Sequence, residues 1–269
     1  LVIAALFILG GIGFPIILNI YKYLRYLIIR KFSSIRSSKD LVYMPWILNL
    51  NSRIVLVTST VLLTAGTVLF YAFEYNNTLA EHSEFGKVVT AFFGAATPRT
   101  AGFNSVDTSS LQFSTIMVVF LLMWIGASPG STGGGIKTST FAIATVNFMS
   151  LARGKDRIEV FKREIAEISV RRAFAIIALS LMVIGTAIFL IASFDSEKDL
   201  LPIAFEAFSA YSTVGLSVGI TSSLSTSSKL VIIATMFIGR VTMLTLLIAI
   251  LRNVKHLNYR YPTEEILIN

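Results

Sequence analysis

The chain has 269 residues, of which 54% are hydrophobic and 14% are charged. Soluble domains average about 25% charged residues, so this composition argues against a soluble protein and is typical of one embedded in a membrane. The absence of cysteine excludes disulfides and thiolate metal sites. The two histidines, His82 and His256, are far apart and lack the spacing of metal ligands.

The net charge of +8 is concentrated in three parts of the chain. Seventeen of the 23 Lys and Arg residues lie in segments 22–53, 153–172 and 252–260, whereas segments 81–107 and 195–206 lean acidic. This distribution follows the positive-inside rule and predicts that the basic segments are cytoplasmic. We therefore expect a multi-pass protein of the cell membrane that contacts lipid, and we expect no nucleic-acid partner.

The first half of the chain begins with two predicted spans. Residues 1–29 are predicted to form one membrane helix, which contains Gly10, Gly11, Gly13 and Pro15. Because this segment opens in an apolar run without Met, we expect the chain to be part of a longer polypeptide. After a basic linker, residues 52–74 form a second apolar segment, long enough to cross about 30 Å of hydrocarbon.

The next segments alternate between spans and shorter apolar helices. Residues 84–97 are too short to cross a bilayer, and the turn at 98–103 cannot continue as a helix. A long apolar stretch at 113–149 is interrupted by glycines at 126–135. The remaining predicted elements are a span at 170–193, a short helix at 200–212, a turn at 213–217 and a last helix at 228–255.

The order span, half-span, turn, span occurs twice. When Gly102 is set on Gly215, the residues that follow align without a gap, and the first spans align with a change in loop length. Thr100 then falls on Thr213, and residues 108–111 fall on 221–224. The basic end of the first span is expected inside in both copies, so the repeats are parallel. The predicted fold class is an all-α membrane protein with parallel span–pore helix–span pseudo-repeats around a central ion pore.

This organisation divides the chain into six predicted parts. They are the last span of an earlier repeat at 1–29, a cytoplasmic linker at 30–51, a third-type repeat with a pore loop and an interrupted second span at 52–152, a cytoplasmic linker at 153–169, a fourth-type repeat with a pore loop at 170–256 and a C-terminal tail at 257–269. Two turns cannot encircle an ion but four can, so we expect further repeats outside this chain.

The two turns are predicted to form part of an ion-selectivity filter. Irregular backbone at membrane depth is tolerated where it is buried in protein or lines an aqueous cavity, and the C-terminal end of a half-helix favours a cation. Glycine permits backbone angles that aim successive carbonyls inward, as in potassium filters. The alternative is that both glycines only end their helices as C-caps. The predicted filter residues are Thr100, Ala101, Gly102, Phe103, Thr213, Val214, Gly215 and Leu216, with K⁺ held by the backbone carbonyls of Thr100, Ala101, Gly102, Thr213, Val214 and Gly215.

These motifs resemble the Trk/Ktr/HKT superfamily of potassium transporters, and most closely its Ktr membrane subunits. The resemblance covers essentially the whole chain and is carried by residues 97–103, by residues 126–138 and by Ile238, Gly239 and Arg240. It implies a subunit of four repeats, a homodimer, and a cytosolic nucleotide-binding regulatory ring of the KtrA type. The basic segments 30–39 and 153–172 and the C-terminal tail are the expected docking surfaces for this ring.

The glycine-rich break in the long apolar stretch is predicted to be an intramembrane gate. A phosphate-binding loop is excluded because Ile136 separates Gly135 from Lys137 and because an apolar span precedes it. Glycines and small polar residues leave helical geometry at little cost, and the resemblance implies a loop below the filter here. The alternative is a break that lets helices pack closely. The predicted gate residues are Gly130, Ser131, Thr132, Gly133, Gly134, Gly135 and Lys137.

Four charged residues near these motifs are candidates for a supporting role. Arg240 lies inside the last apolar segment and is predicted to be a positive barrier that faces the pore; snorkelling or a salt bridge is the alternative. Arg99 and Glu206 could brace the filter turns or serve only the structure, and Asp107 is expected to be a solvated residue of the mouth.

The predicted function is channel-like potassium uptake, with K⁺ as the transported ion and no organic cofactor. No catalytic constellation is present, so we do not expect an enzyme. The alternatives are a Trk-type subunit with another regulator, a Na⁺-coupled or Na⁺-conducting transporter, and a non-conducting assembly subunit. Parallel repeats speak against the inverted repeats of many secondary transporters.

Overall fold

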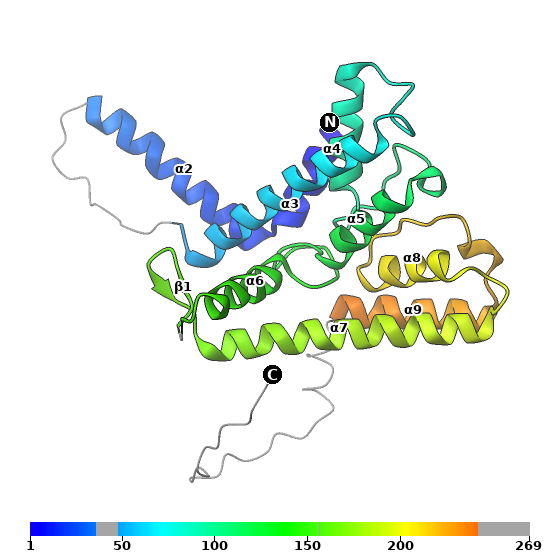
Figure 1. Cartoon of the computed structure of the whole chain (residues 1–269). Coiled ribbons are helices and arrows are strands. Elements are labelled where there is room, and N and C mark those ends of the chain that lie inside the picture. The colour runs from blue at the N-terminus through cyan, green and yellow to red at the C-terminus, as the bar shows by residue number, and fades with distance from the viewer. Residues whose placement is uncertain (36–47, 156, 242–269) are drawn as a thin grey trace, which may run out of the picture.

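The structure, a computed structural model, describes residues 1–35, 48–155 and 157–241, and its regular elements are almost all helical (Figure 1). The helices are α1 (Val2–Ile12), α2 (Phe14–Ile35), α3 (Leu50–Glu74), α4 (Glu84–Ala96), α5 (Phe113–Trp124), α6 (Thr138–Ala152), α7 (Glu167–Phe194), α8 (Leu200–Tyr211) and α9 (Thr226–Val241), with the 3-10 turns η1 (Thr108–Ser110) and η2 (Thr221–Ser223). The predicted helical membrane fold is confirmed. A short hairpin of β1 (Glu159–Val160) and β2 (Arg163–Glu164) in the basic segment 153–172 was not expected.

Two of the described helices, α3 and α7, are long and apolar enough to cross a membrane. They have 25 and 28 residues, and a helix rises about 1.5 Å per residue, so each exceeds the thickness of the hydrocarbon core. The bent pair α1 and α2 makes a third candidate if it is counted as one span. Helices α4 and α8 have only 13 and 12 residues, as expected of half-spans.

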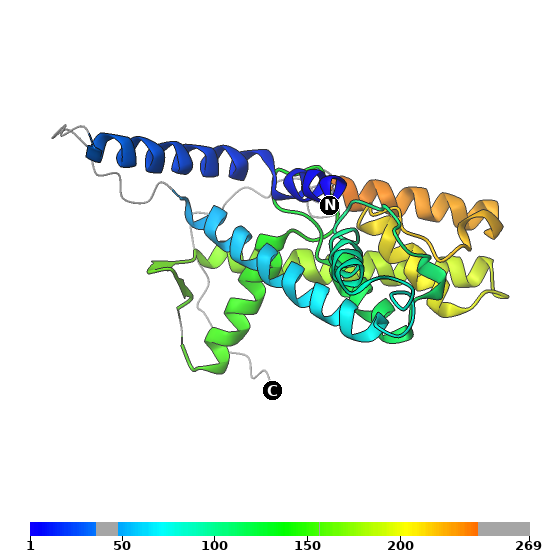
Figure 2. The ribbon, with the colours of Figure 1, turned by 90° about the horizontal axis from the view of Figure 1, so that it is seen from above.

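The prediction of one helix over residues 1–29 is wrong. Helices α1 and α2 meet at Gly13 at an angle of 100°. Gly13 has a φ of 87°, and a Cβ there would lie 2.8 Å from the carbonyl oxygen of Pro129, so only glycine fits this contact. Pro15 suits the first turn of α2 because its missing N–H has no helical partner there. Helix α2 consequently extends away from the other helices (Figure 2).

The other predicted elements lie close to their observed bounds. The long apolar stretch is broken between Trp124 and Thr138, where α5 ends and α6 begins. Helix α7 begins at Glu167, ahead of the predicted 170. Helix α9 is described as far as Val241, and the rest of the predicted helix 228–255 lies outside the described residues, as does the tail 257–269.

The order α3–α4–η1–α5 recurs as α7–α8–η2–α9. In each case an acidic side chain at the end of the long helix holds the start of the last helix. The fully buried Glu74 accepts hydrogen bonds from the Gln112 N–H at 2.9 Å and the Thr115 hydroxyl at 2.5 Å. Asp195 accepts them from the N–H and hydroxyl of Ser225, at 3.1 and 3.0 Å. An anion at a helix N-terminus satisfies free N–H groups and the helix dipole.

Candidate functional site

The predicted filter turns follow α4 and α8 and touch one another. A Cβ added at Gly102 would overlap the carbonyl oxygen of Val214, so the two backbones approach as closely as glycine allows. Segments that are 113 residues apart by their matched glycines therefore meet at one place.

Both turns have the same unusual backbone. Thr100 and Gly102 have φ values of 67° and 72°, and Thr213 and Gly215 have 51° and 91°. The residue between each pair has no positive φ. A residue with positive φ thus alternates with one without it in both turns. A left-handed threonine costs about 1–3 kcal/mol and persists only where its surroundings fix it.

Hydroxyl groups near the ends of the half-helices brace the turns. The Ser209 hydroxyl accepts a hydrogen bond from the Gly215 N–H at 3.2 Å, and the Thr97 hydroxyl donates one to the Phe103 carbonyl at 2.7 Å. Sequence reasoning missed both residues. The only signal for them was a small hydroxyl residue in or just after the last turn of each half-helix.

Glu206 and Arg99 lie in different surroundings. From the sequence, each of them had two possible roles, to brace a filter turn or to serve only the structure. Glu206 accepts hydrogen bonds from the hydroxyls of Ser217 and of Thr221, the latter at 2.8 Å, so it braces the segment after the second filter turn. Arg99 turns away from the filter toward α3 and donates to the Ser59 hydroxyl at 3.3 Å. It ties the first turn to a membrane span.

Asp107 lies between the first filter turn and α5. Its carboxylate accepts a hydrogen bond from the Ser109 N–H at 3.0 Å and caps η1. Hydrogen bonding from Ser109 holds the pKa of this carboxyl below its ordinary value. Asp107 is exposed, as expected of a solvated residue, and it also caps η1.

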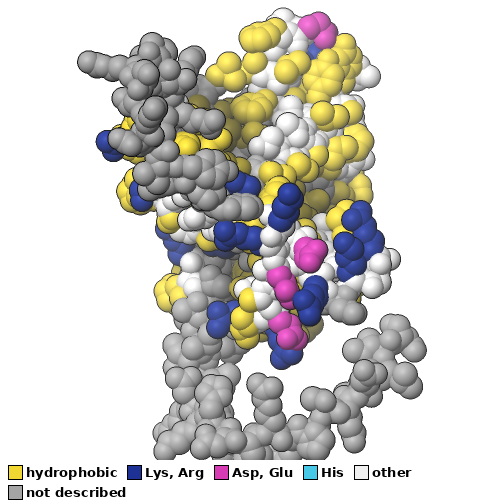
Figure 3. All heavy atoms as spheres, turned by 90° about the vertical axis from the view of Figure 1, so that its left-hand side faces the viewer, with side chains coloured by type: hydrophobic (Ala, Val, Ile, Leu, Met, Phe, Trp, Pro, Cys, Tyr) yellow, Lys and Arg dark blue, Asp and Glu magenta, His cyan; other side chains and the backbone are white. Residues whose placement is uncertain are grey.

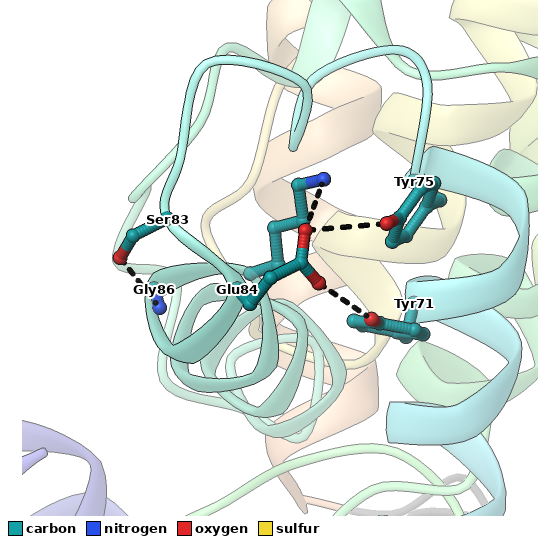
Figure 4. Close-up of polar contacts among 6 residues, drawn as sticks. Tyr71, Tyr75, Ser83, Glu84 and Gly86 are labelled. Atoms are coloured by element: carbon teal, nitrogen blue, oxygen red, sulfur yellow. Dashed lines mark hydrogen bonds and ion pairs between the residues drawn. The ribbon is translucent and has the colours of Figure 1, made fainter.

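The N-terminal end of α4 is fastened to α3 by a cluster of polar side chains (Figure 4). Glu84 accepts hydrogen bonds from Tyr75 at 3.2 Å and Tyr71 at 3.4 Å, and it forms an ion pair with Lys87 at 3.0 Å. The Lys87 ammonium also lies 3.8 Å from the centre of the Tyr75 ring. Ser83 caps the helix through the Gly86 N–H. These contacts fix the start of the helix that carries the first filter turn.

The glycine-rich segment forms a closed loop between α5 and α6. Ile125 and Ile136 pair as an isolated parallel bridge, with the Gly126 N–H donating to the Ile136 carbonyl at 2.9 Å. Both isoleucines are buried, so the base of the loop is fixed in the protein interior. The Ser128 N–H donates to the Gly11 carbonyl at 2.9 Å, which joins the loop to α1.

The structure joins the predicted gate to the predicted barrier. The guanidinium group of Arg240, on α9, donates a hydrogen bond to the Thr132 carbonyl in the loop. The Lys137 ammonium donates to the Gly133 carbonyl at 2.6 Å. From the sequence, Arg240 and the loop were predicted as separate features. Residues 108 positions apart give no spacing signal of contact.

Basic side chains gather on the face that holds the hairpin and the adjoining ends of α6 and α7 (Figure 3). Their exposure fits the cytoplasmic side expected from the positive-inside rule. The exposed Lys and Arg residues of segment 153–172 are Arg153, Lys155, Arg157, Lys162, Arg163, Arg171 and Arg172.

Half-helices that end in paired turns, next to spans of membrane length, define a helical membrane protein of the cation-transport class. Residues 1–257 match the family described as "TrkH: Cation transport protein", and the chain belongs to this family.

Named relatives agree with this assignment. "Ktr system potassium uptake protein B" of Vibrio alginolyticus is 36% identical over 98% of this chain and 54% of its own length. "Potassium/sodium uptake protein NtpJ" of Enterococcus hirae is 34% identical over 100% and 56%. The chain thus spans about half the length of these relatives.

A solved structure shares the fold. The potassium transporter TrkH of Vibrio parahaemolyticus matches with a TM-score of 0.61 over 77% of this chain and 46% of that chain, at 18% identity.

Proposed function

We propose that this chain contributes two turns of a potassium-selective filter to a pore that takes up K⁺ down its electrochemical gradient. The observation that carries the proposal is the pair of matched turns, which share left-handed Thr100, Gly102, Thr213 and Gly215 and meet where Gly102 approaches Val214. Carbonyl groups aimed from such turns replace the hydration shell of an ion. Transport of this kind needs no covalent chemistry, so we propose no enzymatic activity.

The glycine loop and Arg240 act as the gate and the barrier in this proposal. Gly130 to Gly135 and Lys137 occupy the passage beside the filter, and the Arg240 charge opposes the approach of a cation. Both assignments are supported by the hydrogen bond from Arg240 to the loop and by the loop contacts with the filter threonines.

The complete pore has further components in this proposal. Two more filter turns complete the ring, the protein is a homodimer, and a cytosolic nucleotide-binding ring of the KtrA type regulates it. The Vibrio alginolyticus relative is named as part of a "Ktr system", and the exposed basic residues of segment 153–172 are the proposed docking surface. Residues 36–39 and the C-terminal tail, also expected to dock, lie outside the described residues.

A second candidate function is uptake of Na⁺ together with K⁺. The Enterococcus hirae relative is named for both ions. Isotope or flame-photometric uptake of each ion, measured separately and in competition, distinguishes the two functions.

The test is rescue of a potassium-uptake-deficient bacterium by the full-length protein at low external K⁺. Two glycines provide a test variant and a matched control, because a Cβ at either Gly215 or Gly185 would meet no atom within 4 Å. Only Gly215 has a positive φ, of 91°. We expect Gly215→Ala to reduce K⁺ uptake at least tenfold and Gly185→Ala to leave it unchanged. Equal uptake by both variants, or no rescue by the unmodified protein, would contradict the proposal.

A further inference from the structure

The glycine loop packs directly against both filter turns. A Cβ at Gly133 would overlap the Thr100 hydroxyl, and a Cβ at Gly134 would lie 2.5 Å from the Thr213 hydroxyl. Both glycines are buried. Only a residue without a side chain can occupy either position. Close contact with the predicted filter turns is therefore a second reason for these two glycines, besides the flexibility expected of a gate.

The same threonines hold the strained backbone conformation. Thr100 and Thr213 have positive φ values although both are β-branched, and such conformations persist only where neighbouring groups fix them. The Thr213 N–H donates to the Ala210 carbonyl at 3.0 Å. The side-chain hydrogen bonds that brace the turns reach residues after the threonines, for example the Gly215 N–H. The loop packs against both threonine side chains, through Gly133 and Gly134.

Ser212 extends this contact. Its hydroxyl is fully buried, lies 3.2 Å from where a Cβ of Gly135 would be, and has no hydrogen-bond partner among the described residues. A buried hydroxyl without a partner is rare in folded proteins. Here the hydroxyl lies against Gly135, so the loop also packs against the residue before Thr213.

We propose that the seated glycine loop sets the geometry of the filter, so that the position of the loop determines ion preference as well as flux. Contacts of Gly133 and Gly134 hold Thr100 and Thr213 in the left-handed conformation, and this orients the carbonyls that bind the ion. Displacement of the loop releases the threonines and weakens discrimination between K⁺ and Na⁺. This inference rests on the proposed function and adds a mode of regulation to it. Because coupling is reciprocal, K⁺ in the filter stabilises the seated loop.

The first experiment measures K⁺ and Na⁺ uptake by the full-length protein carrying Gly133→Ala or Gly134→Ala. Each added methyl group separates the loop from one filter threonine. We expect the ratio of K⁺ to Na⁺ uptake to fall at least fivefold in both variants. Gly185→Ala is the matched control, since its added methyl group meets no atom within 4 Å, and it should keep the ratio of the unmodified protein.

The outcomes separate this inference from the proposed function. A change in the rate of K⁺ uptake with an unchanged K⁺ to Na⁺ ratio overturns the inference and leaves a potassium pore with a simple barrier. Absence of K⁺ uptake by the unmodified protein overturns the proposed function and the inference that rests on it.

A second measurement avoids the risk that the alanine variants fail to fold. This chain has no cysteine, so in a full-length protein freed of any cysteine elsewhere, Thr132→Cys places a single thiol on the exposed part of the loop. Its rate of labelling by a water-soluble maleimide is compared in K⁺, in Na⁺ and in a medium with neither ion. We expect labelling to be at least twofold slower in K⁺. Equal rates in the three media would show that the filter ion and the loop are not coupled.

Discussion

Arg240 is a charged side chain among apolar residues of α9. A guanidinium group at membrane depth costs about 2.5–3.5 kcal/mol on insertion scales, so it requires a polar partner or a cavity. The Thr132 carbonyl is such a partner, although a carbonyl leaves the positive charge unneutralised. The contact therefore fits a barrier that also holds the loop, and it offers no counter-ion of the kind a structural salt bridge needs.

Arg240→Ala removes both the charge and the hydrogen bond, and we expect it to raise the maximal rate of K⁺ uptake severalfold. Arg240→Lys is the control that keeps the charge but loses the planar donor group. Its rate of K⁺ uptake should lie between those of the unmodified protein and of Arg240→Ala. The measurement is initial uptake in cells normalised to the amount of protein in the membrane. A large loss of uptake at normal expression would contradict the barrier.

Asp195 provides a pH-dependent test outside the membrane-spanning helices. Hydrogen bonds from Ser228 and Ser225 lower its pKa below the ordinary value. A depressed folded-state pKa stabilises the fold above the unfolded value of about 4, and this stabilisation is lost as the pH falls through the folded value. We expect Asp195→Asn to lower the melting temperature in detergent between pH 5 and 8, by an amount that shrinks below about pH 4. A decrease in melting temperature that is the same at all pH values would show that the charge of Asp195 does not stabilise the fold.

At the level of elements, the loop between α5 and α6 has adjacent ends, because Ile125 and Ile136 are paired. The Ile125–Ile136 bridge holds the two ends together, so residues 126–129 can close the gap if the remainder is removed. Deletion of 130–135 should therefore preserve the fold while it removes the Arg240 contact and the filter contacts. We expect K⁺ uptake to increase, measured with the normalisation used for Arg240→Ala. Unchanged or lower uptake in a well-folded deletion would argue against a gate.

Elements that depend on local composition were predictable, and those that depend on a distant contact were not. Helices α3, α4, α7 and α8 follow from apolar length and from turn residues next to them. The bend between α1 and α2 was missed, although Gly13 and Pro15 signalled a weak point. The angle is set by the close approach of Gly13 to Pro129, which lies in another part of the chain.

At the scale of the whole molecule, the chain brings the turns at Gly102 and Gly215 into contact, and in the proposed function other parts of the pore complete the ring. The match of Gly102 with Gly215 could be read from the sequence because aligned copies repeat their residues at one spacing. Their contact, and the bracing by Ser209 and Thr97, required the tertiary structure, since hydroxyl residues are too common to single out by type.

The sequence by itself determined that this is a helical membrane protein with two matched glycine turns, a glycine-rich break and an internal arginine. Hydrophobic length and charge asymmetry dictate these features locally, without reference to neighbours. Only the tertiary structure decided that Gly133 and Gly134 meet Thr100 and Thr213, and that Arg240 meets Thr132. These contacts join residues far apart in the chain, and packing of complete helices brings them together.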